Sequence, residues 1–153
     1  MFDKFKKVFK KDLPEERNDP YVFVPETEIN AELKRNIVQL ERLADDLAKR
    51  LQTKYAKRFE DQGKLNLRIR VCRDIDGDEE ETLTSERCLE KEYRSQIAID
   101  YDGPKYDDEF DAGTLGLWYY FGGYVQGSGT LYDLSQNDLE SDIEETLTNL
   151  LEA

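Results

Sequence analysis

The side chains that most often carry catalysis or bind metals are scarce in this sequence. The chain of 153 residues contains no histidine and only two cysteines. Imidazole is the usual general base near neutral pH and the commonest metal ligand, so His-dependent triads and metal sites are excluded. Phosphate-cradling and dinucleotide-binding glycine loops and a nucleophile elbow are also absent. We therefore predict a protein that is not an enzyme and uses no metal or cofactor.

Three alternating carboxylates, Asp74, Asp76 and Asp78, have the spacing with which a calcium-binding loop begins. Such a loop also needs a glycine at its sixth position and a glutamate at its twelfth. This chain has Glu79 and Ser85 at those two positions. Because an Asp-Gly pair is itself a turn signal, we predict an acidic hairpin turn here without a metal.

The two cysteines, Cys72 and Cys88, lie at equal distances along the chain from Glu80. If residues 72–88 formed one hairpin, the two thiols would face each other and could act as a redox pair. In a reducing compartment, two small apolar thiols are the expected alternative. The chain has no CxxC motif, and we expect the thiols to be free.

Aromatic residues are concentrated in one segment of the chain. Six of them lie between positions 118 and 132: Trp118, Tyr119, Tyr120, Phe121, Tyr124 and Tyr132. Successive strand residues point to opposite faces, so Trp118 and Tyr120 should share one face, and Tyr119 and Phe121 the other. If helices cover only one face, some of these rings form a protein-binding patch. If both faces are covered, the rings belong to the core.

The first eleven residues combine lysine with phenylalanine at helical spacing. Five lysines and one aspartate lie in residues 1–11. The residues expected to dock onto a membrane or a partner are Phe2, Lys4, Phe5, Lys6, Lys7, Phe9, Lys10 and Lys11. A helix this short is not stable alone in water. It would fold against this protein's own core, a partner groove or an anionic lipid surface, or else remain a disordered solubilising tail.

A long helix is predicted over residues 30–62, after a proline-containing linker at 12–29. Its apolar stripe consists of Leu33, Ile37, Leu40, Ala44, Leu47, Leu51, Tyr55 and Phe59. Such a helix spans about 45–50 Å, so we expect it either to extend past the body and pair with another helix, or to be broken once. The stripe could join two copies of the chain through residues 33–59.

The rest of the chain predicts an α+β domain over 30–153, with an antiparallel meander sheet of about four or five strands. The expected strands are 65–72, 93–101, 115–121 and 130–132, with 21–24 as an added edge strand between prolines. Leu65, Leu67, Ile69 and Val71 are expected to face the core. Residues 82–92 fit a strand or a helix. Ser135 and Asp138 resemble a capping box, which predicts a C-terminal helix from 135 to about 151 that packs on the sheet.

Charge divides the chain into two parts. The formal net charge is −13, but residues 1–60 carry 14 basic and 12 acidic side chains, and residues 61–153 carry 8 and 23. An acidic body disfavours binding to nucleic acid, which depends on Lys and Arg. No secretory signal or 18-residue apolar run is present, so we expect a cytoplasmic location.

These features favour a cytoplasmic interaction protein that resembles chaperones, inhibitors or adaptors in its overall character. We expect it to bind a basic protein surface through its acidic C-terminal half and aromatic sheet. The alternative is a peripheral membrane protein, held weakly to the lipid surface by the basic amphipathic helix at residues 1–11.

Overall fold

The computed structural model describes residues 20–103, 112–121 and 128–152. Their elements, in chain order, are β1 (Tyr21–Val24), the 3-10 turn η1 (Glu26–Glu28), α2 (Ala31–Glu60), β2 (Leu65–Ile75), β3 (Asp78–Glu79), the 3-10 turn η2 (Ser85–Arg87), β4 (Tyr93–Asp102), β5 (Gly113–Tyr120), β6 (Gly129–Tyr132) and α3 (Leu139–Glu152). The docking residues expected in segment 1–11 lie outside the described residues, as does Tyr124.

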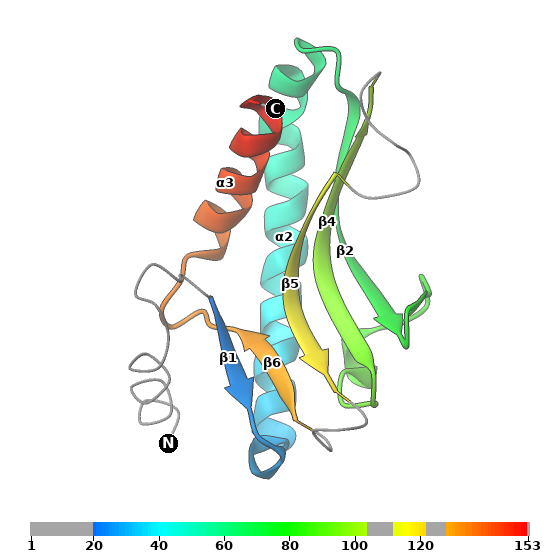
Figure 1. The fold of residues 1–153 in the computed structure, drawn as a ribbon, viewed down its shortest axis with the longest axis vertical. Helices are drawn as coiled ribbons and strands as arrows, with labels where there is room; N and C mark the ends of the chain where they lie inside the picture. The colour runs from blue at the N-terminus through cyan, green and yellow to red at the C-terminus, as the bar shows by residue number, and fades with distance from the viewer. Residues whose placement is uncertain (1–19, 104–111, 122–127, 153) are drawn as a thin grey trace.

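The strands form one antiparallel sheet in the order β1-β6-β5-β4-β2-β3, and both long helices pack on the same face of it. Figure 1 shows α2 running along the sheet, with α3 beside the upper half of α2. The predicted α+β fold is confirmed. The sheet has six strands because the proline-flanked segment β1 pairs with β6, and the short β3 pairs with the end of β2.

Helix α2 is one unbroken helix of 30 residues, about 45 Å long. The side chain of Asn30 caps it by accepting a hydrogen bond from the main-chain N–H of Leu33 at 2.9 Å. The predicted stripe is buried along its whole length, from Leu33 at 7% exposure to Phe59 at 0%. The expectation that the helix breaks or extends past the body is wrong, because the long sheet buries the stripe from end to end. The stripe therefore lies against the chain's own sheet, and a dimer through residues 33–59 would have to use other side chains of this helix.

Two core clusters lie under α2. The larger one joins the middle and C-terminal half of α2 to α3 and to the apolar residues of β2, β4 and β5. The smaller one joins the first turns of α2 to Val24, Cys88, Tyr93 and Trp118. The predicted alternation in β4 is confirmed, since Tyr93, Ile97 and Ile99 are buried.

Strand β2 departs from its predicted pattern at its start. Leu67 and Ile69 are buried as expected, but Leu65 is 47% exposed. Asn66 has a positive φ of 55°, and the register with β4 shifts between Leu65 and Arg68. This irregularity interrupts the two-residue alternation, so the prediction for Leu65 is wrong.

Residues 82–92 form neither a strand nor an α-helix; they form turns and η2. The hairpin of β2 and β3 pairs only two residues of each strand. Cys72 lies opposite Gln96 in the sheet, whereas Cys88 lies in the smaller core cluster. Residues 72–88 therefore do not form the single hairpin that would place the cysteines opposite each other, and both are free and buried, as the favoured alternative predicts.

Helix α3 begins at Leu139, later than the sequence predicts. The hydroxyl and the main-chain N–H of Ser135 both donate to the Asp133 carboxylate, and residues 134–136 form a turn. The side chain of Asp138 accepts from the N–H of Ser141 at 3.3 Å and so caps the helix. The capping box at Ser135 is wrong, because an acidic side chain before the serine holds it in the preceding turn.

Candidate protein-binding surface

The register of the strands aligns one row of side chains on the sheet face that points away from α2 and α3, here called the outer face. Phe23 pairs with Thr130, Thr130 with Tyr119, Tyr119 with Arg94, and Arg94 with Asp74. Directly paired residues of antiparallel strands share a face. The row therefore crosses the sheet from β1 to β2 and brings aromatic and charged groups together.

The aromatic run is divided between the two faces as predicted. Trp118 and Tyr120 pack on the helix side, with ring centroids 6.0 Å apart. Tyr119 and Phe121 form an edge-to-face pair at 4.6 Å and 83°, and both are half-buried. The pair of Tyr119 and Phe121 is the part of the run that contributes to the outer face.

Two other residues of the predicted patch belong to the core. Trp118 is 1% exposed, and its indole N–H donates to the main-chain oxygen of Cys88 at 2.7 Å. Tyr132 is also 1% exposed, and its hydroxyl donates to Asp142 of α3. Burial and the neighbouring carboxylate raise the pKa of Tyr132, so its phenol stays protonated. The burial of these two rings fixes β5 and β6 against the helices.

A segment rich in acid lies at the same end of the sheet as Tyr119 and Phe121. Residues 74–92 contain nine acidic and two basic side chains, and Figure 1 shows the β2–β3 hairpin near the end of β5. Asp74 accepts hydrogen bonds from the Arg94 guanidinium at 3.1 Å and from the Gly77 N–H at 3.3 Å. This carboxylate thus holds a turn, and no cluster that could bind a metal is found among the residues that the structure describes.

Three acids at and just after the tip of this hairpin are not neutralised within the described chain. Asp76, Asp78 and Glu81 are exposed, and they form no ion pair with any residue in the described part of the chain. We call these three residues the acidic tip. Close to the aromatic pair, the Tyr119 hydroxyl donates to Glu92 at 2.8 Å. Because of this hydrogen bond first, and burial second, the pKa of Tyr119 is raised.

The acid of α3 is partly neutralised within the chain. Arg50 binds Glu140 through two hydrogen bonds of 2.9 and 3.0 Å, and Lys54 binds Glu144 at 2.9 Å. The hydroxyl of Tyr55 also donates to Glu144 at 2.6 Å. These contacts join α2 to α3 across about ninety residues of sequence. The acidic tip is therefore a stronger source of unbalanced charge than the inner side of α3.

Sequence reasoning missed a buried polar cluster between α2 and η2. Glu41 is 0% exposed and accepts hydrogen bonds from Arg73 at 2.8 Å, Ser85 at 2.5 Å and Tyr93 at 2.8 and 2.9 Å. Burial, and then the Glu41 charge, raise the pKa of Tyr93, so Tyr93 remains a donor. With all its contacts inside the protein, this cluster holds η2 to α2. We call it the Glu41 cluster.

A signal for the Glu41 cluster was present in the sequence. Ile37, Glu41, Ala44 and Ala48 follow one another at helical spacings of four, three and four, and all four are buried. A charged residue within an apolar row of this kind indicates a buried ion pair. The sequence does not indicate which basic residue forms that pair.

Shallow grooves are found on both faces of the sheet. One, of about 110 Å³, lies on the outer face and is lined by side chains that include Tyr21, Arg94, Tyr119 and Thr130. The other, of about 230 Å³, lies between α2 and β6. Both are smaller than the roughly 300–1,000 Å³ that small-molecule sites usually occupy. Grooves of these volumes fit single side chains of a partner protein better than a whole small-molecule substrate.

Comparisons with known proteins do not assign the chain to a family. In residues 20–103, 112–121 and 128–152, no helix is long and apolar enough to cross a membrane. Neither protein-family models, nor curated proteins, nor solved structures give a match to this chain.

Proposed function

We propose that this protein is a non-enzymatic, cytoplasmic interaction protein, of the chaperone, inhibitor or adaptor kind, that binds a basic surface of another protein. The binding surface is the end of the sheet that carries the acidic tip and the pair of Tyr119 and Phe121. The proposal depends on their proximity: the main-chain N–H of Asp76 donates to the main-chain oxygen of Glu92 at 3.1 Å, and the N–H of Glu92 donates at 2.8 Å to the main-chain oxygen of Tyr120, which lies between Tyr119 and Phe121 in the chain.

The acidic tip supports the choice of a basic partner. Its three carboxylates are exposed, and residues of the opposite charge within the described chain do not neutralise them. A cluster of one sign attracts the opposite sign, speeds the encounter and disfavours acidic partners. Salt screens such exposed charges over about 10 Å at 0.1 M, so the binding should weaken as salt is added.

The aromatic pair supports a protein partner rather than free ions or small cations. Tyr and Phe bring a large contact area at a low cost in side-chain entropy, and aromatic residues are enriched at the centres of protein interfaces. Phe121 packs edge-on against Tyr119, whose hydroxyl is held by Glu92. The rings are therefore ordered before a partner arrives, which reduces the cost of binding.

The Glu41 cluster also fits a binding protein better than an enzyme. A general base must lie within hydrogen-bond reach of a substrate proton. The Glu41 carboxylate instead accepts from three side chains of its own protein and has no exposed surface. Its hydrogen-bonding capacity is used inside the fold.

Capture from an extract of the native host tests this proposal with two variants of equal charge. The first replaces the acidic tip, as D76N/D78N/E81Q. The control, D46N/E60Q/E145Q, removes three exposed acids elsewhere. A protein captured by the wild-type chain is identified by mass spectrometry, purified, and its affinity for all three chains is measured at low and high salt.

The expected result is a basic partner that binds the control variant nearly as well as the wild type and binds the tip variant at least about tenfold more weakly. A tenfold loss corresponds to about 1.4 kcal/mol, within reach of two or three screened charge contacts. Equal affinity for the two variants, or an affinity insensitive to salt, contradicts the proposal.

The spacing of Phe and Lys in residues 1–11 favours a second candidate function, peripheral attachment to an anionic membrane. Each lysine near such a surface contributes about 1 kcal/mol, so attachment would be weak and reversible. Co-sedimentation with vesicles that contain anionic lipid tests this function. The intact chain is compared with a variant in which the five lysines of residues 1–11 are changed to glutamine. Equal pelleting of both chains contradicts it.

A further inference from the structure

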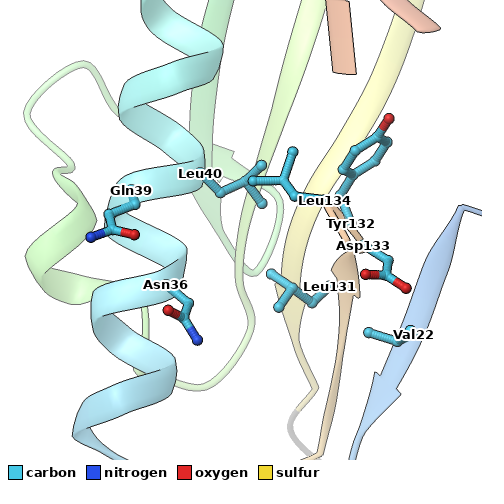
Figure 2. Close-up of a pocket in the computed structure, with 8 residues that line it drawn as sticks. All are labelled: Val22, Asn36, Gln39, Leu40, Leu131, Tyr132, Asp133 and Leu134. Carbon is cyan, nitrogen blue, oxygen red and sulfur yellow. The ribbon is translucent and has the colours of Figure 1, made fainter. Parts of the chain in front are cut away.

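The groove between α2 and β6 is an apolar surface that neither helix of the described structure fills. It is lined by Val22, Asn36, Gln39, Leu40, Leu131, Tyr132, Asp133 and Leu134. Figure 2 shows α2 on one side and strands β6 and β1 on the other, with Leu131 directed toward the helix. The floor is aliphatic, and Asn36 and Gln39 provide amide groups at the rim.

The end of α3 explains why the groove is open. Helix α3 begins at Leu139 and covers only the upper half of α2, as Figure 1 shows. Below that point Leu134 is 43% exposed, and Leu43, one helical turn beyond Gln39, is 40% exposed. These are two of the three exposed large apolar side chains in the part of the chain that the structure describes. Covering them would be favourable by the hydrophobic effect.

We propose that this groove receives the chain's own N-terminal segment, residues 2–9. This segment is joined to the groove by a short stretch of the same chain. The described chain begins at Pro20, and Val22, two residues later, lines the groove. The ten residues from Lys10 to Asp19 can span up to about 35 Å, which is more than the segment needs to turn back. A short tether of this kind gives an effective concentration in the millimolar range.

The chemistry of the segment matches that of the groove. Phe2, Phe5 and Phe9 fall on one side of the helix that the sequence predicts, and an amphipathic helix in an apolar groove is a common mode of peptide recognition. The segment is too short to fold alone, so its order depends on such a surface. The charged residue in the lining of the groove is Asp133, and residues 2–9 carry three lysines against one aspartate.

This inference does not rest on the proposed function, because the groove lies on the helix side of the sheet and the acidic tip and aromatic pair do not line it. It does bear on attachment to a membrane. The same phenylalanines would face the groove or the lipid, so an anionic membrane would have to draw the segment out of the groove before binding it.

Reactivity of a thiol placed in the groove tests the proposal in the full-length chain. Gln39→Cys puts an exposed cysteine at the rim, and the two natural cysteines are buried. The rate of its reaction with a soluble disulfide reagent is measured with the natural N-terminus and with F5S/F9S. Thr53→Cys, exposed on the same helix and outside the groove, is the matched control.

Docking of the segment should slow the reaction at position 39. The F5S/F9S change should then raise that rate about fivefold, which corresponds to a docked population of about four-fifths, and leave the rate at position 53 unchanged. The protection should not depend on protein concentration, because the segment and groove belong to one chain.

Equal rates at position 39 with either N-terminus would overturn the proposal. Protection that grows with protein concentration would also overturn it, because it would assign the groove to a second copy. Fluorescence of Trp118, the single tryptophan of the chain, checks that every variant is folded. A second variant, Leu134→Lys, alters the groove and leaves the segment intact; it should likewise raise the rate at position 39 and not at position 53.

Discussion

The Glu41 cluster should contribute strongly to the stability of the fold, and a substitution at Arg73 measures that contribution. Replacing Arg73 by methionine keeps most of the length and apolar surface of the side chain and removes the cation. The Glu41 carboxylate would stay fully buried without the guanidinium that now donates to it at 2.8 Å. Breaking a buried pair in this way typically costs 3–5 kcal/mol. Because Ser85 and Tyr93 still donate to the carboxylate, we expect the lower end of that range, about 3 kcal/mol.

Arg70→Met is the matched control. Arg70 lies three residues earlier on β2, its side chain is 43% exposed, and its contacts with Glu79 and Asp100 are 3.4 and 4.0 Å. Exposed pairs of this kind are worth about 0–1 kcal/mol. The loss in the free energy of unfolding should therefore be larger for Arg73→Met than for Arg70→Met by about 2 kcal/mol or more.

Urea unfolding followed by Trp118 fluorescence measures the difference. Trp118 is buried in the cluster that also contains Tyr93, so it reports on this part of the core. A loss of 3 kcal/mol lowers the urea midpoint by about 1–3 M for slopes of about 1–3 kcal/mol per M. The double variant E41M/R73M should lose less than Arg73→Met alone, because no buried charge is left unpaired.

Two results would contradict this prediction. One is a loss of less than 1 kcal/mol for Arg73→Met, which would mean that water reaches Glu41 or that the pair contributes little. The other is a double variant that is less stable than Arg73→Met, which would mean that the carboxylate stabilises the fold without its cation.

Three further predictions concern other parts of the core. In Gly129→Ala the added carbon would lie 2.5 Å from an indole carbon and 2.5 Å from a main-chain oxygen, so thermal unfolding should show a loss of about 1–3 kcal/mol; Gly103→Ala, with its nearest atom at 3.5 Å, should be near neutral. The hydrogen bond from Tyr55 is the largest cause that lowers the pKa of Glu144 below its ordinary 4.5. The stability from this carboxylate is therefore present above about pH 4.5 and lost as the pH falls toward the folded pKa. Tyr55→Phe should cost about 1 kcal/mol at pH 7 and less at pH 3, as measured by urea unfolding at both values. Burial raises the pKa of Cys88 to about 12, so this thiol should react with a disulfide reagent at pH 8 only after unfolding in urea; rapid reaction in the folded protein would contradict its assignment as an inert core residue.

Much of the fold could be predicted from local patterns. The stripe of α2, the alternation of β4 and the division of Trp118 and Tyr119 between two faces depend only on the 3.6-residue and two-residue periods of helix and strand. These predictions are confirmed because the apolar side chains of each element have one face on which to pack. The same patterns failed at Leu65, where the shift in register interrupts the alternation.

The candidate site was predicted only in part. The aromatic run was found, and the structure divides it into core residues and the outer pair of Tyr119 and Phe121. The open groove between α2 and β6 depends on where α3 begins and on which strand follows β5 in the sheet. No local pattern carries that information, because the lining comes from segments about a hundred residues apart.

The residue types alone establish which chemical groups are absent and which faces of the elements are apolar. The lack of histidine, the small number of cysteines and the periods of the apolar residues can be read residue by residue. Which charges form pairs depends instead on contacts between distant segments. Arg73 lies on the buried Glu41, and Arg50 and Lys54 lie on the acidic helix α3, whereas the acidic tip has no such partner within residues 20–103, 112–121 and 128–152. The physical reason is that the energy of a charge depends on its burial and on its nearest opposite charge, and both are set by contacts between segments that are distant in the chain.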